Sequence, residues 1–238
     1  MLSSDVTKSQ RATLRRIEAH ILHMHRDQGA QSETLGMVEV VSMPGDASSL
    51  LNYIAPRRSA AWVSTSALRD GLDRLKAIGC PPRVVFYDRL LPPVFKQSLV
   101  EIGLQLEQEE SIYALGLSAN EAKSTSSGAR SVHLWVSQAN HAPVMGRLHA
   151  LPTLATGMID HIQAVDQGSI GALLLAARRA AASRSIDFLF MTTDSADVES
   201  LGFEFLGHRV IFGAAASEKR STGTYDRVAQ PLPPPPSD

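Results

Sequence analysis

The sequence contains one short pattern twice. The stretch DVESLGFEFLG, Asp197–Gly207, indicates a short helix that ends at a glycine and continues directly into a strand. The stretch SLVEIGLQLEQ, Ser98–Gln108, has nearly the same pattern. Glycine is common at helix ends because it adopts the left-handed conformation without a steric penalty. A chain with this pattern in two places is expected to contain the same supersecondary unit twice.

The elements around the two copies extend the repeat. The predicted order is a helix over Ser66–Gly79, a strand over Arg83–Asp88 and a helix over Pro92–Gly103, matched by a helix over Gly168–Arg184, a strand over Ile186–Thr193 and a short helix that ends at Gly202. This alignment pairs Phe86 with Phe190 and Gly103 with Gly202. A repeat of this length indicates duplicated domains rather than a solenoid. The alternative is the chance similarity that any two α/β segments can show.

The remaining patterns complete an α/β chain. Leu14, Ile17, Ile21 and Met24 form an apolar stripe on a first helix over Arg11–Asp27. Further extended segments are predicted at Met37–Met43, Ala60–Thr65, Leu104–Leu117, Ser131–Gln138, Ala142–Leu151, Thr156–Val165 and Phe203–Gly213.

Composition shifts divide the chain into regions. Trp62 and Trp135 lie on predicted strands at comparable places in the two halves, and each is expected to anchor a core. The stretch 118–130 is rich in Ser, Ala and Gly without periodicity, which is typical of a linker. We predict a polar lead-in at 1–10, an N-terminal domain at 11–117, this linker at 118–130, a C-terminal domain at 131–216 and a solvated, proline-rich tail at 217–238.

The composition argues against several classes of function. The 238 residues carry a formal net charge of -1, so no overall field recruits nucleic acid or an anionic membrane. The single Cys80 rules out an intrachain disulfide and fits a reducing cytosol. We see no signal peptide and no apolar run of the roughly 20 residues that a membrane span needs. A cytoplasmic protein is therefore expected.

Three histidines, His20, His23 and His25, lie close together on the first predicted helix. The first two are three residues apart, a spacing that can place two ligands on one metal ion. No carboxylate or further histidine completes such a site in the sequence. An exposed helical face is therefore the preferred interpretation, and no metal is expected.

Four stretches of the second half, MIDHIQAV, DQGSIGALLLAARR, DFLFMTT and DVESLGFEF, follow one another as strand, main helix, buried strand and short helix. This order resembles the GNAT superfamily of N-acetyltransferases. The resemblance covers about 131–212 well and 37–117 more weakly. It implies two GNAT-like units, each a mixed, mostly antiparallel sheet flanked by helices, with the N-terminal unit degenerate.

The resemblance implies a site for acetyl-CoA, used as a co-substrate, where the main helix begins. A helix N-terminus presents unpaired N–H groups that suit a diphosphate, and Gly168 and Gly171 would let the backbone approach it closely. The glycine spacing departs from the family pattern, because Asp166 or Val165 stands where Gln or Arg is usual. The alternative is that both glycines only start a helix. The implied cofactor-binding residues are Ile162, Ala164, Gln167, Gly168, Ser169, Ile170, Gly171 and Ala172.

Acetyl transfer to an amine needs a base, donors for the oxyanion and an acid for the leaving thiolate. Asp160 lies on the matching strand and is the expected base, and it and His161 should point to opposite faces. The tyrosine that often serves as acid in the family falls on Val198, which cannot donate a proton. Ser195 is the nearest hydroxyl, with capping of the short helix as its alternative role.

The sequence therefore predicts an acyltransferase that moves an acetyl or short acyl group from acyl-CoA directly to an unidentified amine. The first alternative is a catalytically inactive GNAT-like protein that serves as a binding or assembly subunit. The second is an unrelated α/β enzyme. No nucleic acid and no membrane are expected as partners, while a protein partner or a homodimer is left open.

Overall fold

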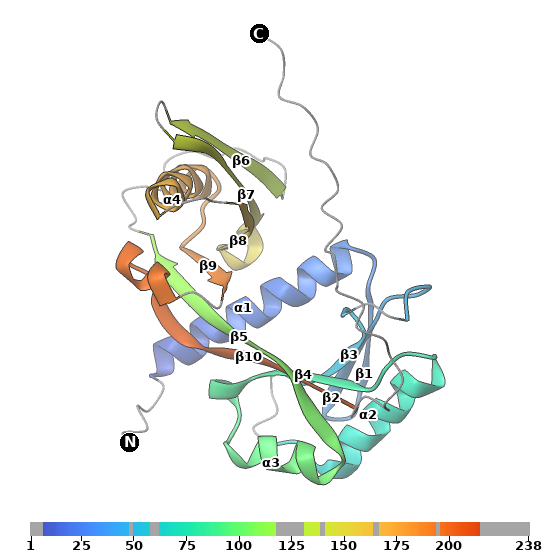
Figure 1. The fold of residues 1–238 in the computed structure, drawn as a ribbon. Coiled ribbons are helices and arrows are strands. Elements are labelled where there is room, and N and C mark those ends of the chain that lie inside the picture. Colours follow the sequence, from blue (N-terminus) through green and yellow to red (C-terminus); the bar gives the residue numbers. More distant parts are fainter. Residues whose placement is uncertain are drawn as a thin grey trace.

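The computed structural model describes residues 7–47, 50–57, 62–117, 131–138, 141–163, 167–193 and 196–214. Within these ranges the chain forms one ten-stranded sheet with helices on both faces (Figure 1). The helices are α1 (Lys8–Asp27), α2 (Thr65–Ala77), α3 (Val94–Glu101) and α4 (Gln167–Ala182), with the short 3-10 helices η1 (Asp88–Leu90), η3 (Pro152–Leu154) and η4 (Ala196–Leu201). The strands are β1 (Gln31–Leu35), β2 (Val38–Ser42), β3 (Tyr53–Pro56), β4 (Arg83–Tyr87), β5 (Leu104–Gly116), β6 (Ser131–Gln138), β7 (His141–Leu151), β8 (Thr156–Gln163), β9 (Phe188–Thr192) and β10 (Glu204–Ala214).

The strand order in the sheet is β1-β2-β3-β4-β10-β5-β9-β8-β7-β6. In the N-terminal half, β1, β2 and β3 are antiparallel, and β4 returns parallel to β3 after α2. In the C-terminal half, β6, β7 and β8 are antiparallel, and β9 returns parallel to β8 after α4. The two halves thus have the same order of elements along the chain. In the sheet, β1 to β4 run inward from one edge and β6 to β9 run inward from the other.

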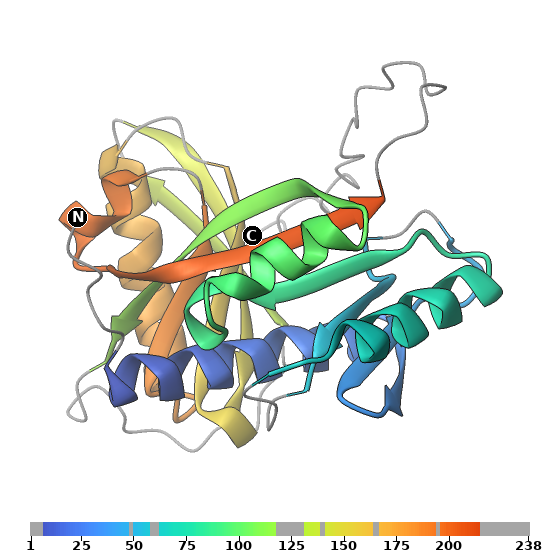
Figure 2. The same cartoon turned by 90° about the horizontal axis from the view of Figure 1, so that it is seen from below.

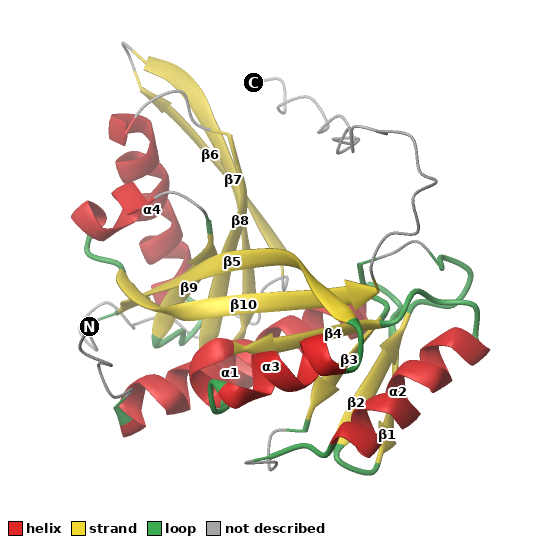
Figure 3. Cartoon of the chain, turned by 60° about the horizontal axis from the view of Figure 1, so that its bottom comes forward, coloured by secondary structure: helices red, strands yellow, loops and turns green. Residues whose placement is uncertain are grey.

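The two predicted units are not separate. The long strand β5 follows α3 in the first half but pairs with β9 of the second half. In turn β10 follows η4 in the second half but pairs with β4 of the first. The two strands also pair with each other at the middle of the sheet, where they run side by side (Figure 3). The prediction of two distinct units is therefore not confirmed, because the exchanged strands join both halves into one sheet.

The repeated helix–glycine–strand pattern has the predicted local geometry. Gly103 ends α3 with φ +87°, and Gly202 ends η4 with φ +89°. Both are in the left-handed region that glycine alone adopts readily. Each glycine N–H bonds back to a carbonyl of the last turn, Val100 in one case and Glu199 in the other, at 2.9 and 3.0 Å. The chain then enters β5 and β10.

The helix α1 covers the opposite face of the sheet from α2, α3 and α4. On β9, Phe188 and Phe190 pack in one core with α1, whereas Leu189 and Met191 pack in another core with α4. This alternation follows from the two-residue period of a strand. Figure 2 shows α1 running along the sheet across both halves. The predicted apolar stripe of this helix is buried, as expected.

The same alternation corrects the alignment of the two repeats. Phe86 packs in the core with α2 and α3, whereas Phe190 packs on the face of α1. The prediction that these two residues correspond is therefore wrong, because their side chains lie on opposite faces of the sheet. A shift of one residue moves a strand side chain to the other face of the sheet.

Several local predictions are wrong. The first helix, predicted over Arg11–Asp27, begins earlier, because α1 starts at Lys8 with a capping box between Thr7 and Gln10. The helix predicted from Ser66 starts at Thr65 instead, and its cap is Ser64, whose hydroxyl accepts from the Ala67 N–H at 3.2 Å. No strand is formed at 62–64, and Trp62 is 60% exposed rather than a core anchor. The Trp135 side chain, the linker 118–130 and the tail 217–238 lie outside the described residues.

Candidate active site

The strands β8 and β9 pair only over their first residues. Thr156, Gly157 and Met158 are opposite Phe188, Leu189 and Phe190, and the parallel ladder ends there. From this point β8 pairs with β7 alone, and β9 with β5. Among the described residues, the edge of β8 from 159 to 163 therefore has no strand partner on the β9 side. Its backbone N–H and C=O groups on that side are available to a ligand.

A β-bulge lies on the part of β8 that pairs with β7 but not with β9. Met145 is opposite Gln163, but Arg147 is opposite Asp160, so β8 has one extra residue between these pairs. His161 lies in this bulge and has a left-handed backbone conformation, with φ +51°. Such a conformation in a residue other than glycine is uncommon and is found at functional sites more often than elsewhere. The bulge bends the strand and turns backbone groups out of the regular ladder.

The bulge also breaks the predicted alternation of Asp160 and His161. The His161 Nε2 lies 3.8 Å from the Asp160 carboxylate, so the two side chains do not point to opposite faces. The His161 side chain is 63% exposed and the Asp160 side chain 15%. The prediction of opposite faces assumed a regular strand, and it is wrong because the extra residue changes the direction of the second side chain.

Asp160 forms a bidentate ion pair with Arg147 of the neighbouring strand β7. The Arg147 Nε donates to one carboxylate oxygen at 2.8 Å, and an Nη donates to the other at 2.5 Å. The hydrogen bonds to Asp160 raise the pKa of the Arg147 guanidinium. The pair fixes the orientation of the carboxylate, and each oxygen keeps a further lone pair for another donor.

Three polar side chains form a buried chain of hydrogen bonds next to this pair. His20 of α1 contacts the Thr156 hydroxyl through Nδ1 at 2.6 Å and the His149 Nδ1 through Nε2 at 3.0 Å. His20 and Thr156 are fully buried, and His149 is 8% exposed. Burial lowers the pKa of His20 to about 3, and it lowers the pKa of His149 as well. Both imidazoles are therefore neutral at pH 7.

The burial of His20 overturns the prediction of an exposed histidine face. His25 is buried too, and its Nδ1 bonds to the Tyr53 hydroxyl at 2.9 Å. Within the described ranges, no group of three or more His, Cys, Asp and Glu side chains is arranged to hold a metal ion. These two histidines join α1 to the two halves of the sheet.

A groove runs along α4 toward η4. It encloses about 470 Å³ of empty space, part of which is open to solvent. The lining residues are Leu115, Gly171, Leu174, Leu175, Arg178 and Leu201. A Cβ placed on Gly171 would meet no atom within 4 Å, so this part of the groove is open. The Arg178 Nε is buried and finds no hydrogen-bond partner among the described residues.

The remaining predicted site residues are placed as follows. Ile162 on β8 and Ile170 on α4 are partly buried and pack against the same core. Gly171 and Ala172 follow in the first turns of α4, and Gln167, Gly168 and Ser169 start this helix, with side chains outside the described set. Ala164 and Ser195 also lie outside the described residues. Val198 is buried in the core beneath α4.

Sequence reasoning missed Arg147, His149 and Thr156. A weak signal was present, because His20 interrupts an apolar helix stripe and therefore needs a buried polar partner. Arg147 and His149 alternate on one strand in the sequence, which is typical of two residues on one face. Their partners, Asp160 on β8 and His20 on α1, lie on other elements and could not be read from local spacing.

No helix in the described part of the chain is both long and apolar enough to cross a membrane. No protein-family model matches the sequence, and no curated protein matches it either.

Comparison with solved structures gives the fold. A GCN5-related N-acetyltransferase from Kribbella flavida is similar with a TM-score of 0.57 and 11% identity, over 82% of this chain and 95% of that chain. A conserved protein of unknown function from Staphylococcus epidermidis is similar with a TM-score of 0.51 and 12% identity, over 77% and 93% of the two chains. The chain therefore has the α/β fold, with a mixed sheet, of the GNAT N-acetyltransferases.

Proposed function

We propose that the protein is an acyltransferase that moves an acetyl or short acyl group from acyl-CoA to an amine, with the active site in the C-terminal half. The observation that carries the proposal is the end of the β8–β9 ladder at Met158, with a bulge directly beyond it. An unpaired, bulged strand edge offers backbone donors to a carbonyl oxygen, and the fold is one that acetyltransferases use.

The residues around this edge suit acyl-CoA. The first N–H groups of α4 have no partner within the helix itself, and a helix N-terminus of this kind suits a diphosphate. The groove along α4 is mainly apolar and is lined in part by Arg178, whose buried Nε has no hydrogen-bond partner among the described residues. The guanidinium would donate to a phosphate or carbonyl oxygen. Ile162, Ala164 and residues 167–172 would surround the thiol end and the diphosphate. When bound, acyl-CoA supplies the activated acyl group.

We assign the proton-accepting role to Asp160. Arg147 uses one acceptor position on each carboxylate oxygen and leaves the others for an ammonium group or a bridging water. The ion pair holds the carboxylate in one orientation beside the bulge, which is what a positioned base requires. Ser195 remains the proposed proton donor, since the buried Val198 has no proton to give.

One observation favours the inactive alternative. Val198 occupies the position where the resemblance places an acid, and it is buried among apolar side chains. If Ser195 does not reach the thiolate, the chain would bind acyl-CoA without rapid transfer. Binding alone therefore tests the part that both functions share, and turnover separates them.

The binding of acetyl-CoA is expected to depend on the open space at Gly171. Calorimetry should show a single site on the wild-type protein, and thermal stability should rise by about 2.7 kcal/mol at a hundredfold excess of ligand over the dissociation constant. The substitution Gly171→Phe should abolish binding, because its ring would fill the groove where a Cβ meets no atom. Gly171→Ala is the matched control, since it adds one methyl group and should keep the site. Absence of binding at millimolar acetyl-CoA, or unchanged binding by Gly171→Phe, would contradict the proposal.

A further inference from the structure

The buried chain of hydrogen bonds lies on the same face of the sheet as the proposed base, Asp160. On β8, Met158 packs in the core with α1, whereas Ile159 packs in the core with α4. Asp160 follows on the α1 face, where its carboxylate accepts from Arg147 of β7. His149 is two residues beyond Arg147 on the same strand, so both side chains point to this face, with Cα atoms about 7 Å apart.

The direction of these hydrogen bonds is set at their buried end. Thr156 is fully buried, and within the described residues its hydroxyl has a single partner, the His20 Nδ1 at 2.6 Å. If His20 carried its proton on Nδ1, that N–H would donate to the hydroxyl oxygen, and the hydroxyl proton would have no acceptor. A buried donor without a partner is destabilising. The Thr156 hydroxyl therefore donates to an unprotonated His20 Nδ1.

This direction fixes the tautomers of both histidines. Burial lowers the pKa of His20 to about 3 and also lowers the pKa of His149, so each neutral ring carries one proton. With its Nδ1 unprotonated, His20 carries the proton on Nε2 and donates to the His149 Nδ1 at 3.0 Å. The His149 Nδ1 is then an acceptor. The proton of the His149 ring therefore lies on Nε2.

The His149 Nε2 is the free end of the buried chain. It makes no hydrogen bond within the described part of the protein and is not a buried atom. Its direction is fixed, because the other nitrogen of the ring is held by His20. An N–H of this kind can only donate. The molecule therefore presents a single, oriented donor on the face where Asp160 lies.

The charged groups around His149 restrict the atom that it can bind. Asp27 and His23 of α1, Asp160 of β8 and Arg147 of β7 all act on the ring electrostatically. Arg147 already pairs with Asp160. With two carboxylates near the ring, a carboxylate of a ligand would be repelled. A neutral carbonyl oxygen accepts the N–H without this repulsion.

We propose that the His149 Nε2–H binds a neutral carbonyl oxygen of the acceptor amine, and that Thr156 positions this donor through His20. The inference rests on the proposed acyltransferase function and names the class of its acceptor, an amine with an adjacent amide carbonyl. Asp160 takes a proton from the ammonium group, and the neutral amine attacks the acyl carbon. The C–N bond forms, the C–S bond breaks, and a second proton of the nitrogen ends on the thiolate. His149 keeps its proton throughout.

NMR of the histidine ring nitrogens in the full chain tests the tautomers without any ligand. We expect His20 and His149 to carry their protons on Nε2 at pH 7. Thr156→Val keeps the shape of the side chain but removes the hydroxyl, so both rings should lose this preference, whereas Thr156→Ser should retain it. A proton on Nδ1 of either ring in the wild-type protein, or no change in Thr156→Val, would overturn the proposal.

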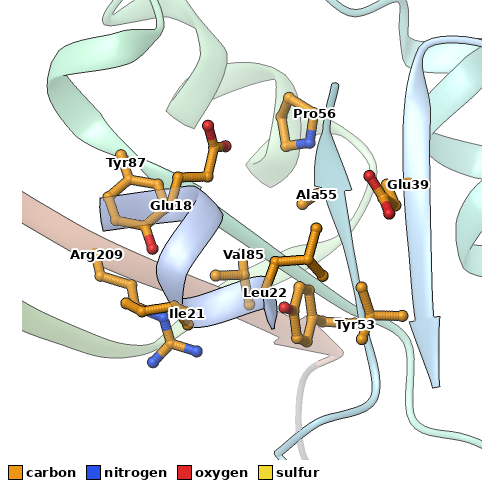
Figure 4. A pocket seen from close by; sticks show the side chains of 11 residues that line it. Glu18, Ile21, Leu22, Glu39, Tyr53, Ala55, Pro56, Val85, Tyr87 and Arg209 are labelled. Atoms are coloured by element: carbon orange, nitrogen blue, oxygen red, sulfur yellow. The ribbon is translucent and has the colours of Figure 1, made fainter. Parts of the chain in front are cut away.

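The first half of the sheet supplies a matched control. There α1 buries a second histidine, His25, whose Nδ1 bonds to the Tyr53 hydroxyl at 2.9 Å. Tyr53 lines the cavity between α1 and the first half of the sheet, together with Val85 and Arg209 (Figure 4). Tyr53→Phe removes a hydroxyl from a buried histidine of the same helix, and should leave the His149 tautomer unchanged. Equal changes in Tyr53→Phe and Thr156→Val would point to a general loosening of α1 and would contradict the proposal.

Three matched compounds test the acceptor class by calorimetry on the full chain with CoA, so that no transfer occurs. Glycinamide has the amino group and a neutral carbonyl, isobutylamine has the same shape without the carbonyl, and glycine has a carboxylate instead. We expect glycinamide to bind best. His149→Phe should weaken glycinamide about tenfold, the effect of one hydrogen bond, and leave isobutylamine unchanged. Equal losses for the two amines, unchanged glycinamide affinity, or no glycinamide binding at millimolar concentration would overturn the proposal.

The same measurements separate this inference from the proposed function. If acetyl-CoA binds and amines are acetylated, but glycinamide has no advantage over isobutylamine, the role of His149 alone is contradicted. If acetyl-CoA does not bind, whereas glycinamide binds without it and depends on His149, the acyltransferase proposal is contradicted and the carbonyl site is retained.

Discussion

The substitution Asp160→Asn is expected to lower turnover by about 10²–10⁴-fold, with acetyl-CoA affinity unchanged, because it removes the proposed base and adds no bulk. The measurement is the release of free thiol from acetyl-CoA in the presence of any amine that the wild-type protein acetylates. Calorimetry with acetyl-CoA on the same variant separates loss of chemistry from loss of binding. The asparagine keeps the size of the side chain, so the local packing changes little.

The matched control is Arg147→Gln, which breaks the same ion pair but keeps the carboxylate. If Asp160 is the base, this variant retains most of the turnover, with a loss that reflects poorer orientation alone. Equal losses in the two variants would mean that the ion pair only holds β7 to β8. Wild-type turnover in Asp160→Asn would remove Asp160 from the mechanism.

Acidification from pH 8 to pH 5 is expected to lower the free energy of unfolding by about 4 kcal/mol through His20 and His25. Burial lowers the pKa of each to about 3 in the folded protein, against 6.5 in the unfolded chain. Between these values the unfolded chain binds more protons, so stability falls as the pH falls. At pH 5 each histidine contributes about 2 kcal/mol of this loss.

Chemical denaturation at the two pH values measures this effect. A variant with both histidines replaced by asparagine should lose most of the pH dependence, although it starts from a lower stability. His161→Asn is the control for a histidine replacement as such, because that side chain is 63% exposed. Equal stability at pH 8 and pH 5 would contradict the burial of these two rings.

The elements of the C-terminal half could be predicted from the sequence because their signals are local. Within the strand predicted over Ile186–Thr193, the run Phe188–Met191 is apolar and bounded by polar residues, and β9 occupies Phe188–Thr192. The main helix was predicted over Gly168–Arg184 and occupies Gln167–Ala182. The glycines at 103 and 202 end their helices by their own conformational freedom. Each of these signals acts over a few residues.

The arrangement of the sheet could not be predicted in the same way. The sequence patterns of β5 and β10 predict strands. Which strands they pair with depends on contacts between residues far apart in the chain. The short strands β1 and β3 have five and four residues, too few for a clear pattern. The residue type of Trp62 and its predicted strand favour a place in a core, whereas its exposure depends on what surrounds it.

For the candidate site, the resemblance points to Asp160 as the base, which stays a prediction. Its partner Arg147 could not be predicted, because it lies on another strand in a register set by the bulge. The hydrogen-bond chain from Thr156 through His20 to His149 joins residues more than a hundred positions apart. The residues that line the cavity between α1 and the first half of the sheet, among them Tyr53, Val85 and Arg209, likewise come from different elements. Such juxtapositions follow from the fold and not from spacing.

The proposed binding site for acyl-CoA is the point where β8 diverges from β9 and α4 begins. Backbone hydrogen exchange, measured with and without acetyl-CoA, tests this location directly. We expect slower exchange confined to the end of β8, at Asp160–Ile162, and to the first turns of α4, with no change in β3, β4 or α2. Protection in the N-terminal half instead, or no protection at saturating acetyl-CoA, would contradict it.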